Sequence, residues 1–539
     1  MVDTLFYNGK FYSLEKEGEC FKALGIKNGK SIQLFKENPV NLKAKNRVDF
    51  TGKTIIPGLI DTHIHLMPTA YYLALGFSMS ELHDKIFLPS DLKGVKDKLQ
   101  KYTSQKKFKY PILCTNYIIS TIKENRLPTI RELDNWLPGF DVIIISSDGH
   151  SSSYSSSILK KIGISTYPEK GIYDNQNHVD TLKILEKYMF KRINLRLILS
   201  GIEKTINQAI TYGIVSLHCL EGLKNDIKDL SLFTFKLIAP YLPLYIRLYA
   251  QIQDVYKLKK WEKKLQNKRI GGCGFWEIDG SVSSRNAAFY TNYKNSKDHG
   301  EILYKEQDLI KNIEKAYNHG YQVTSHAIGT KAIDQLLNSY ESILMKNNDS
   351  KNQFRFRIDH YDFPSSEAVI KSTKLQILHI LQPGFYWMDR EIKQLNMYKK
   401  TLNSSVLKLK TPLKKIIQNG GIICGSSDSP VQSLNPFIQI HGMVNYPIKE
   451  ERISVYEALR SYTYYGAFAT FEEDLRGTLK KGKYADFIVL KNDPFKIPKE
   501  EVINLKVEST YIKGKKVNKI KLTLFKLIMN NIFRKKAKF

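Results

Sequence analysis

The sequence predicts an α/β fold of parallel strands and helices, together with a small β-rich unit built from both chain ends. A helix-like run, a glycine, a strand-like run and a polar residue follow one another at 206–218, 310–326 and 413–428. This order is typical of parallel β/α structure. Both ends of the chain instead contain short β-rich runs, and neither end has enough apolar residues for its own core.

The three middle segments share one design. Gly213, Gly320 and Gly421 each end a helical pattern, and glycine is the preferred residue just past a helix. Each following strand closes on His or Asp. In a barrel of parallel strands the strand C-termini share one face, so these polar residues are expected to converge although they are far apart in sequence.

The chain ends are read as parts of one β-domain. Asn8-Gly9 and Asn28-Gly29 are hairpin signals in residues 3–50, and the end of the chain adds a strand at 482–490 and a hairpin around Lys513-Gly514. Pairing the two ends would give them a common core. Residues from about 80 to 185 fit the repeating pattern poorly, so we expect an inserted subdomain there.

Composition narrows the class of protein. The 539 residues are enough for two or more domains, and 42% hydrophobic residues suit a folded chain without the long apolar run of a membrane span. The first residues lack the pattern of a secretory signal, so a cytoplasmic location is expected. Five scattered cysteines without Cys-x-x-Cys indicate reduced thiols and argue against a disulfide framework or a thiolate zinc site.

The formal net charge of +30 raises the question of an anionic partner. The lysines are spread along the chain, as on solvated faces, and no nucleic-acid-binding motif accompanies them, so no specific nucleic-acid partner is expected. Only the segment 518–539 concentrates basic residues. We interpret it as a basic amphipathic tail and surface appendage, with docking to a partner or to an anionic membrane left open.

His63 and His65 form the first candidate metal motif. They end a strand-like run that begins near Pro57-Gly58. Alternate residues of a strand point to the same face, so both imidazoles can bind one ion.

Three later residues complete the candidate set: His326, His360 and Asp428, each at the end of a strand-like run. Zinc accepts nitrogen and oxygen ligands, and a catalytic zinc keeps one position for water, whose pKa falls to ~7. A neighbouring carboxylate can take the proton of that water and pass it to a leaving nitrogen. We assign this role to Asp428.

These motifs resemble the amidohydrolase superfamily, in particular the YtcJ-like metal-dependent hydrolases of the amidohydrolase 3 group. The resemblance covers about residues 3–517. Six segments carry it: Pro57–His65, Ile278–Ala288 with its Asp-Gly-Ser, Ser325–Asp334 with His-Ala-Ile-Gly, Arg357–His360, Gly425–Val431, and Gly477–Leu490 with Asp493-Pro494.

The resemblance implies a TIM-like (β/α)8 barrel with a small β-sandwich domain formed by both chain ends. We divide the chain into 1–56 (first part of the sandwich), 57–464 (barrel), 465–517 (second part) and the tail. It further implies hydrolysis of a non-peptide carbon–nitrogen bond, amide or N-formyl, in a small-molecule substrate by a metal-activated water. His63, His65, His326, His360 and Asp428 take the metal-site positions, with zinc the favoured ion, and a homodimer is left open.

One position departs from the family pattern. Many relatives have a lysine four residues before the Asp of Asp-Gly-Ser, and its carbamate is expected to bridge two metals; here that position is Phe275. Phe275, Glu277 and Asp279 are expected on one strand face, so Glu277 could replace the bridging group. Otherwise the site holds a single ion and His360 stabilises the developing oxyanion. We favour the single ion.

Four further residues are candidates for substrate binding. His150 follows an apolar strand and either contacts substrate or orders its loop, and His218 either lines the pocket or lies structurally at the inner rim. Tyr386 and Trp387, together with Phe385 before them, form either an aromatic wall or ordinary loop packing. A catalytically inactive binding protein of the same fold is the alternative function, motivated by the missing lysine.

Overall fold

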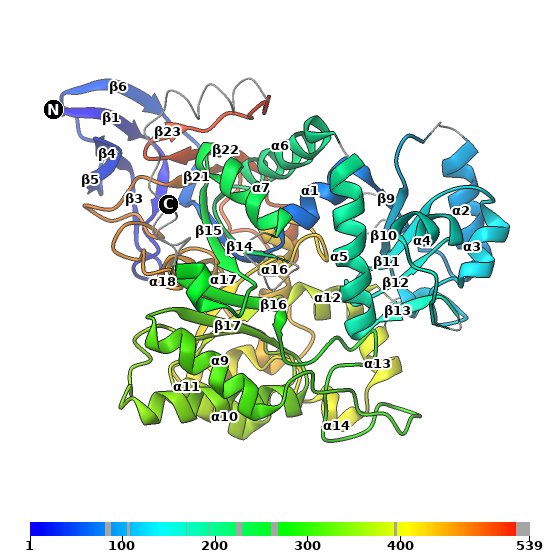
Figure 1. Ribbon diagram of the computed structural model, residues 1–539. Helices are drawn as coiled ribbons and strands as arrows, with labels where there is room; N and C mark the ends of the chain where they lie inside the picture. Colours follow the sequence, from blue (N-terminus) through cyan, green and yellow to red (C-terminus); the bar gives the residue numbers. More distant parts are fainter. Residues whose placement is uncertain are drawn as a thin grey trace.

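The computed structural model of the chain describes residues 1–80, 88–104, 108–168, 170–192, 194–222, 229–259, 268–392 and 396–523. Eight parallel strands form a barrel at its centre (Figure 1). They follow chain order around the barrel: β8 (Leu59–Ile64), β14 (Ile214–Glu221), β15 (Tyr245–Ala250), β16 (Arg269–Glu277), β17 (Gln322–Ala327), β18 (Arg357–His360), β19 (Leu378–Leu381) and β20 (Ile422–Gly425). The TIM-like barrel predicted from the sequence is confirmed.

The barrel closes where the last strand meets the first. The N–H of Asp428 donates to the carbonyl of His63 at 2.9 Å, and the hydroxyl of Thr62 donates to the carbonyl of Gly425 at 2.9 Å. These hydrogen bonds lie at the C-terminal ends of β8 and β20. The closure therefore holds two candidate metal ligands side by side through their backbones.

The outer helices follow the sequence pattern. α9 (Glu306–Asn318) buries Leu309, Ile313 and Ala316, a helical spacing that presents one apolar stripe to the barrel. Gly320, just beyond α9, has φ +73°, a left-handed conformation that glycine adopts at little cost. The same arrangement recurs after α6 (Leu195–Thr211), with Gly213 at φ +81°, and after α15 (Leu413–Gln418), with Gly420 at φ +79°. The predicted alternation of helix, glycine and strand is confirmed.

Two sheets at the chain ends pack face to face. One contains β1 (Val2–Tyr7), β4 (Ala23–Lys27), β5 (Lys30–Phe35) and β6 (Ala44–Asp49); the other joins β2 (Lys10–Tyr12), β3 (Cys20–Phe21) and β7 (Thr54–Pro57) to β21 (Phe487–Leu490), β22 (Val507–Ile512) and β23 (Lys515–Lys516). The ring of Phe6 lies 5.1 Å from that of Phe487 and 5.4 Å from that of Tyr511. Both chain ends thus share one aromatic core, as predicted.

One predicted turn is wrong and two are confirmed. Asn28-Gly29 joins β4 to β5, and Lys513-Gly514 joins β22 to β23, each as an antiparallel hairpin. Asn8-Gly9 instead lies where the chain leaves β1 and enters β2, and these strands belong to different sheets. The left-handed φ of Asn8, +60°, turns the chain at a corner of the sandwich rather than in a hairpin.

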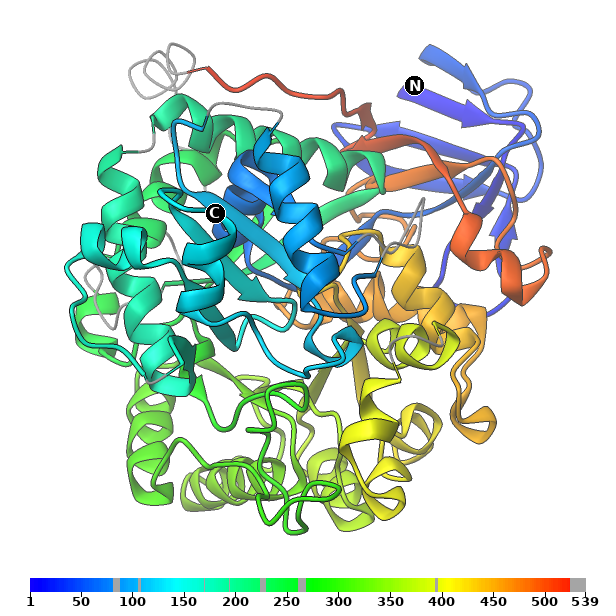
Figure 2. The same cartoon turned by 90° about the vertical axis from the view of Figure 1, so that its right-hand side faces the viewer.

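A further sheet lies beside the barrel, and we call the segment from β9 to α5 (76–192) the insert. Its strands are β9 (Gly76–Ser78), β10 (Ile112–Tyr117), β11 (Val142–Ser146), β12 (Ser151–Tyr154) and β13 (Ile172–Asp174), with helices α2 (Leu92–Ser104), α3 (Ile130–Trp136), α4 (Ser156–Ile162) and α5 (Asn175–Arg192). α5 stands between this sheet and the barrel in Figure 1, and Figure 2 views the molecule from the insert side. The division of the chain into these units remains a proposal.

The last described residues run along the outside of α6. The N–H of Ile520 donates to Asn207 and the N–H of Leu522 donates to Glu203, each at 2.7 Å. Residues 524–539 of the predicted amphipathic tail lie outside the described residues. In the described part of the chain, no helix combines the length and the apolar character that crossing a membrane requires.

Candidate metal centre

Three predicted ligands meet at the barrel closure. The Nε2 atom of His63 lies 3.2 Å from Asp428 Oδ1, and the Nε2 atom of His65 lies 3.4 Å from the same oxygen. The two Nε2 atoms are themselves 3.4 Å apart. His63 is fully buried and Asp428 nearly so, which means that little water can screen this group of facing nitrogen and oxygen atoms.

His63 is oriented from behind by a buried carboxylate. Its Nδ1 atom lies 3.5 Å from Asp359 Oδ1. Asp359 also accepts hydrogen bonds from Arg357, at 3.0 Å, and from the hydroxyl of Thr324, at 2.7 Å. A carboxylate behind one imidazole nitrogen is the usual way in which proteins fix a histidine so that the other nitrogen can bind a metal.

The other three imidazoles follow the same rule. One nitrogen of each ring faces a protein oxygen: His65 Nδ1 faces Leu220 O at 3.2 Å, His360 Nδ1 faces Gln382 Oε1 at 3.0 Å, and His326 Nε2 faces Gly280 O at 3.3 Å. Those oxygens can only accept, so the N–H of each ring is on their side. The second nitrogen of each ring is left with its lone pair for a ligand.

Two of the ligand positions have unusual backbone conformations. His360 has φ +73° and Asp428 has φ +57°. This left-handed region costs a non-glycine residue about 1–2 kcal/mol, and such residues cluster at functional sites. Both strained residues carry candidate ligands, which is consistent with side chains aimed by function.

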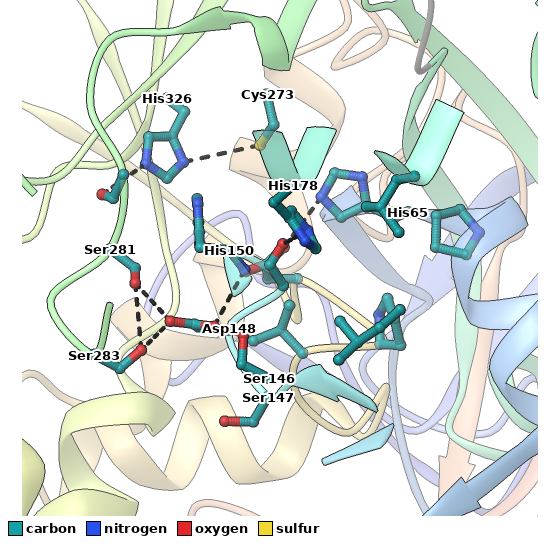
Figure 3. A pocket seen from close by; sticks show the side chains of 18 of the residues that line it. His65, Ser146, Ser147, Asp148, His150, His178, Cys273, Ser281, Ser283 and His326 are labelled. Carbon is teal, nitrogen blue, oxygen red and sulfur yellow. Dashed lines mark hydrogen bonds and ion pairs between the residues drawn. The ribbon is translucent and has the colours of Figure 1, made fainter. Parts of the chain in front are cut away.

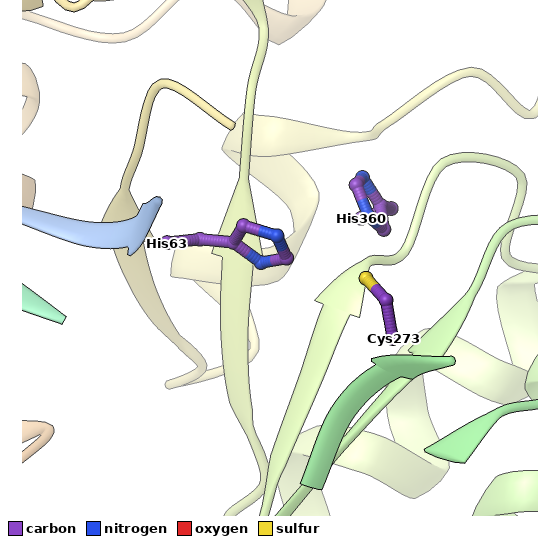
Figure 4. Close-up of side chains that lie close together, drawn as sticks. All are labelled: His63, Cys273 and His360. Atoms are coloured by element: carbon purple, nitrogen blue, oxygen red, sulfur yellow. The ribbon is translucent and has the colours of Figure 1, made fainter. Parts of the chain in front are cut away.

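A cysteine lies among the four histidines. The Sγ atom of Cys273 is 3.9 Å from His326 Nδ1, and Cys273 forms a close group with His63 and His360 whose donor atoms all lie within 4.8 Å of one another (Figure 4). Figure 3 shows the same thiol on the cavity side of β16, beside His326. We call these six residues, the four histidines with Cys273 and Asp428, the central cluster.

Glycines in β16 bring this cysteine into place. Gly271, Gly272 and Gly274 have φ of +107°, +128° and +62°. A Cβ atom on Gly271 would lie 1.9 Å from the carbonyl oxygen of Thr324, so no other residue fits there. The pairing of β16 with β17 jumps from Gly272 directly to Glu277, and the four residues between them bulge into the mouth of the barrel.

This bulge corrects two expectations. Phe275, Glu277 and Asp279 do not share one regular strand face, because Phe275 lies inside the interruption of the ladder and Asp279 lies beyond the end of β16. The cysteine spacing argued against a thiolate ligand, whereas the structure places Cys273 among the imidazoles. The signal in the sequence was Gly271-Gly272-Cys273-Gly274, a cysteine enclosed by glycines two residues before the position where relatives have lysine.

The pKa shifts in the central cluster reflect one buried network. Burial alone would lower the pKa of His65, but Asp428 and Cys273 raise it to about 10. Burial likewise opposes the charge on Cys273, yet His326 and His360 hold the pKa of its thiol well below the usual value. His63 and His65 keep the pKa of Asp428 low in the same way.

This donor set fits a divalent cation. Thiolate, imidazole and carboxylate are the zinc ligands of proteins, and here the Nε2 atoms of His63 and His65 approach each other to 3.4 Å beside the carboxylate and the thiol. Without a cation the cluster would need extra protons to hold its nitrogens and oxygens together. The preference for a single ion rested on the missing lysine, and Cys273 removes that reason because a thiolate can also be shared by two ions.

A second group joins the barrel to the insert. His150, from the turn before β12, places Nδ1 3.0 Å from Glu277 Oε1, and its ring centre lies 5.5 Å from that of His326. Burial opposes the charge on His150, but Glu277 raises its pKa to about 9. His150 and Glu277 thus form an ion pair, and we call them with His326 the peripheral group.

Asp148 fastens this turn to the barrel. Its carboxylate accepts hydrogen bonds from the hydroxyls of Ser281 at 2.6 Å and Ser284 at 2.9 Å, and Ser283 also donates to it (Figure 3). The serines belong to the Asp-Gly-Ser segment. Asp279 of that segment accepts three backbone N–H groups, from Ala288, Ile328 and Gly329. Its Oδ1 atom also lies 3.8 Å from Nε2 of His326, so Asp279 shapes the loops around the site and supports one ring of the central cluster from behind.

Comparison with known proteins shows to which family this chain belongs. The model of the amidohydrolase family matches residues 47–518. The chain belongs to this family. The family predicted from the sequence motifs is confirmed. A cluster of side chains able to hold a metal is what a member of a family of metal-dependent hydrolases is expected to have.

Individual relatives of this amidohydrolase are distant but similar in length. Protein LONG AFTER FAR-RED 3 of Arabidopsis thaliana is 25% identical over 96% of this chain and 92% of its own length. N-substituted formamide deformylase of Arthrobacter pascens is 22% identical over 95% of this chain and 98% of its own. A solved metal-dependent hydrolase of Pyrococcus horikoshii shares the fold, with a TM-score of 0.68, 20% identity, and coverage of 92% of this chain and 99% of its own.

The amidohydrolase has a cavity of about 450 Å³ at the mouth of its barrel. It reaches His65, Cys273, His326, His360 and Asp428 of the central cluster. His150 and Glu277 also line it, so the peripheral group stands between the cluster and the insert.

Three of the predicted substrate contacts lie elsewhere. His218 is fully buried inside the barrel within β14, away from the cavity, with its ring 6.1 Å from that of Tyr249. Tyr386 packs against other tyrosines, and Trp387 packs on His441 at 4.5 Å. Of the three consecutive aromatic residues, only Phe385 lines the cavity, where α12 (Gly384–Glu391) places it together with Met388. The spacing along the chain could not show which face of this helix is turned inward.

Proposed function

We propose that this amidohydrolase cleaves a non-peptide carbon–nitrogen bond, of the amide or N-formyl type, in a small molecule. The observation that carries the proposal is the central cluster itself, a buried set of nitrogen, sulfur and oxygen donors at the mouth of the barrel. The relative named as an N-substituted formamide deformylase supports the choice of bond, although its identity to this chain is only 22%.

We further propose that His63, His65, His326, His360, Asp428 and Cys273 hold the metal, with zinc the favoured ion. Cys273 would take the place of the lysine that many relatives have, and Glu277 is then not needed as a bridge. When bound, a divalent ion lowers the pKa of the water that it holds and polarises the carbonyl group of the substrate.

The protein groups would then handle the proton and the geometry. Asp428 takes one proton from the attacking water and delivers it to the leaving nitrogen, as its position beside both His63 and His65 allows. The oxygen of the water joins the carbonyl carbon while the carbon–nitrogen bond breaks, so an acid and an amine leave. His360, held by Gln382, lies beside His63 and His326, with ring centres 5.2 and 4.4 Å away.

A substrate panel tests this function. Zinc-loaded protein is assayed with N-formyl and N-acyl amines, and the same panel is repeated with Asp428→Asn. We expect a loss of about 10³-fold in kcat/KM, in the range that removal of a general base causes. Asp97→Asn on the exposed face of α2 is the matched control and retains activity. Equal turnover by Asp428→Asn and the wild-type protein would contradict the mechanism, and no turnover of any amide would favour the binding-protein alternative.

A further inference from the structure

The cavity extends from the central cluster toward the insert, and its far end is apolar. Six side chains define this end, which we call the apolar arm. They are Leu75 at the end of α1 (Leu66–Leu75), Leu113 of β10, Ile143 and Ile145 of β11, and Leu182 and Leu185 of α5. Four of these six are buried, and all belong to or contact the main hydrophobic core. The arm is therefore a preformed part of the fold, as ligand pockets usually are.

The charges around the cavity are unlike those of the whole chain. The chain has a formal net charge of +30, yet among the described residues that line the cavity none is Lys or Arg. Lys183 of α5 reaches the ring of the lining residue Phe275, with Nζ 4.6 Å from the ring centre, but Asp180 already pairs with it at 2.8 Å. A substrate carboxylate or phosphate placed in the apolar arm would thus find no lysine or arginine among the described lining residues. Burying an unpaired charge of this kind costs several kcal/mol, so such substrates are poorly suited to the arm.

The acidic residues of the lining do not call for a cationic substrate either, because protein groups already occupy them. Asp148 accepts from serines and Glu277 pairs with His150. Lys410 Nζ lies 2.6 Å from Asp362, and Asp389 accepts the backbone N–H of Tyr398 at the start of α13 (Met397–Thr401).

The two remaining carboxyl groups beside the arm are similarly placed. Glu221 accepts the N–H of Met67 at 3.1 Å, and its burial raises its pKa to about 8. Glu186 is also engaged in an interaction within the protein. The carboxyl groups beside the arm therefore already interact with groups of the protein itself.

From this arrangement we infer that the substrate is an uncharged amide with one long apolar substituent, which fills the arm between the barrel and the insert. The inference rests on the proposed function for the position of the amide, and on the cavity for the rest. The apolar group can be attached to the nitrogen or to the acyl carbon, since either places it beyond the central cluster. N-acyl amino acids, which have a free carboxylate, are excluded as good substrates.

Chain length is the first test. The zinc-loaded protein is assayed with N-alkylformamides from methyl to hexyl, and with N-methylamides from acetamide to heptanamide. Along the series that uses the arm, kcat/KM is expected to rise about threefold or more per methylene, the ratio that burial of a CH₂ group gives. The series that rises shows which side of the amide enters the arm. Flat rates in both series would overturn the inference and leave the proposed function intact.

Charge is the second test. N-Formyl-6-aminohexanoate has the reach of N-hexylformamide but ends in a carboxylate. We expect its kcat/KM to be at least about 100-fold lower, because the charge would be buried without a partner. Comparable rates for the two compounds would overturn the inference.

A matched pair of variants locates the effect on α5. Leu182→Trp places a larger ring in the arm, and Ile184→Trp places the same ring on the exposed side of this helix, where Ile184 is 42% exposed. Leu182→Trp is expected to lower the ratio of hexyl to methyl activity about tenfold. Ile184→Trp is expected to keep that ratio, and equal effects of both variants would contradict the assignment.

A binding measurement separates this inference from the proposed function. N-Hexylmethanesulfonamide is an uncharged mimic that is not hydrolysed, and its affinity is measured by calorimetry with the wild-type protein and both tryptophan variants. Binding that Leu182→Trp alone weakens supports the arm even if no amide is turned over, in which case only the proposed function fails. Absence of binding together with absence of turnover overturns the inference.

Discussion

The barrel mouth and the insert contribute differently to the same cavity. The barrel supplies donors whose backbones are fixed by strand pairing and by closure of the sheet, as the hydrogen bond between Asp428 and His63 shows. The insert supplies an apolar wall and two histidines. His150 pairs with a barrel carboxylate rather than joining the central cluster, and His178 is held by Ser152 and Gly149 of the insert itself. The comparison teaches that reactivity and fit are built by separate parts of the chain, so they can be altered separately.

The largest effect is expected from Cys273→Ala in the barrel. Loss of the thiolate removes a donor that touches all the imidazoles of the cluster, so bound metal should fall by at least one equivalent and kcat/KM by about 10²-fold or more. Metal analysis and the amide assay measure both. Cys20→Ala, in the terminal sheets, is the control. Full metal content in Cys273→Ala would contradict the role of the thiol.

A smaller effect is expected where the two regions meet. Glu277→Gln breaks the ion pair with His150 but keeps the shape of the side chain, and we expect kcat/KM to fall about tenfold while metal content stays at the wild-type level. Loss of metal from Glu277→Gln would contradict this assignment, because Glu277 would then belong with the ligands of the central cluster.

Asp148→Asn tests how the insert is fastened. The hydroxyls of Ser281, Ser283 and Ser284 all donate to Oδ2, whereas Oδ1 accepts from the hydroxyl of Ser146 and the N–H of His150. Asparagine keeps only one acceptor oxygen, so it cannot serve both sets of donors. A destabilisation of about 1–3 kcal/mol is expected for the attachment of the insert, seen as faster hydrogen exchange in β11 and β12 with little change in the barrel strands. Uniform changes over both regions would instead indicate a single cooperative unit.

The smallest effect is expected when the pH is lowered, and it concerns the stability of the insert. His178 of α5 is buried against Ser152 and Gly149, and burial lowers its pKa to about 4. In the unfolded chain this histidine has a pKa near 6.5, so on acidification it binds a proton at a higher pH than in the folded protein. The contribution of His178 to the stability of the insert is therefore complete above about pH 6.5 and is lost toward pH 4, by at most about 3 kcal/mol. Hydrogen exchange of α5 between pH 7 and 4.5 should show this decline, and His178→Gln should weaken it. A decline of equal size in that variant would exclude His178 as the cause.

The sequence predicted the barrel and five of the six donors of the central cluster for one physical reason. Strand periodicity and closing glycines mark where each strand ends, and parallel strands bring their ends together. Cys273 escaped prediction because three left-handed glycines break the alternation of β16, and no period describes a bulge. Tyr386 and Trp387 were misplaced because packing of α12 on its neighbours, which the local sequence does not encode, decides the inward face.

X-ray absorption at the zinc edge tests the central claim most directly. If the six residues of the cluster hold the ion, the spectrum of the zinc-loaded protein contains a sulfur shell at about 2.3 Å beside nitrogen and oxygen shells, and Cys273→Ser loses the sulfur shell. A spectrum of the wild-type protein with nitrogen and oxygen shells alone, or the same sulfur shell in Cys273→Ser, would contradict the account.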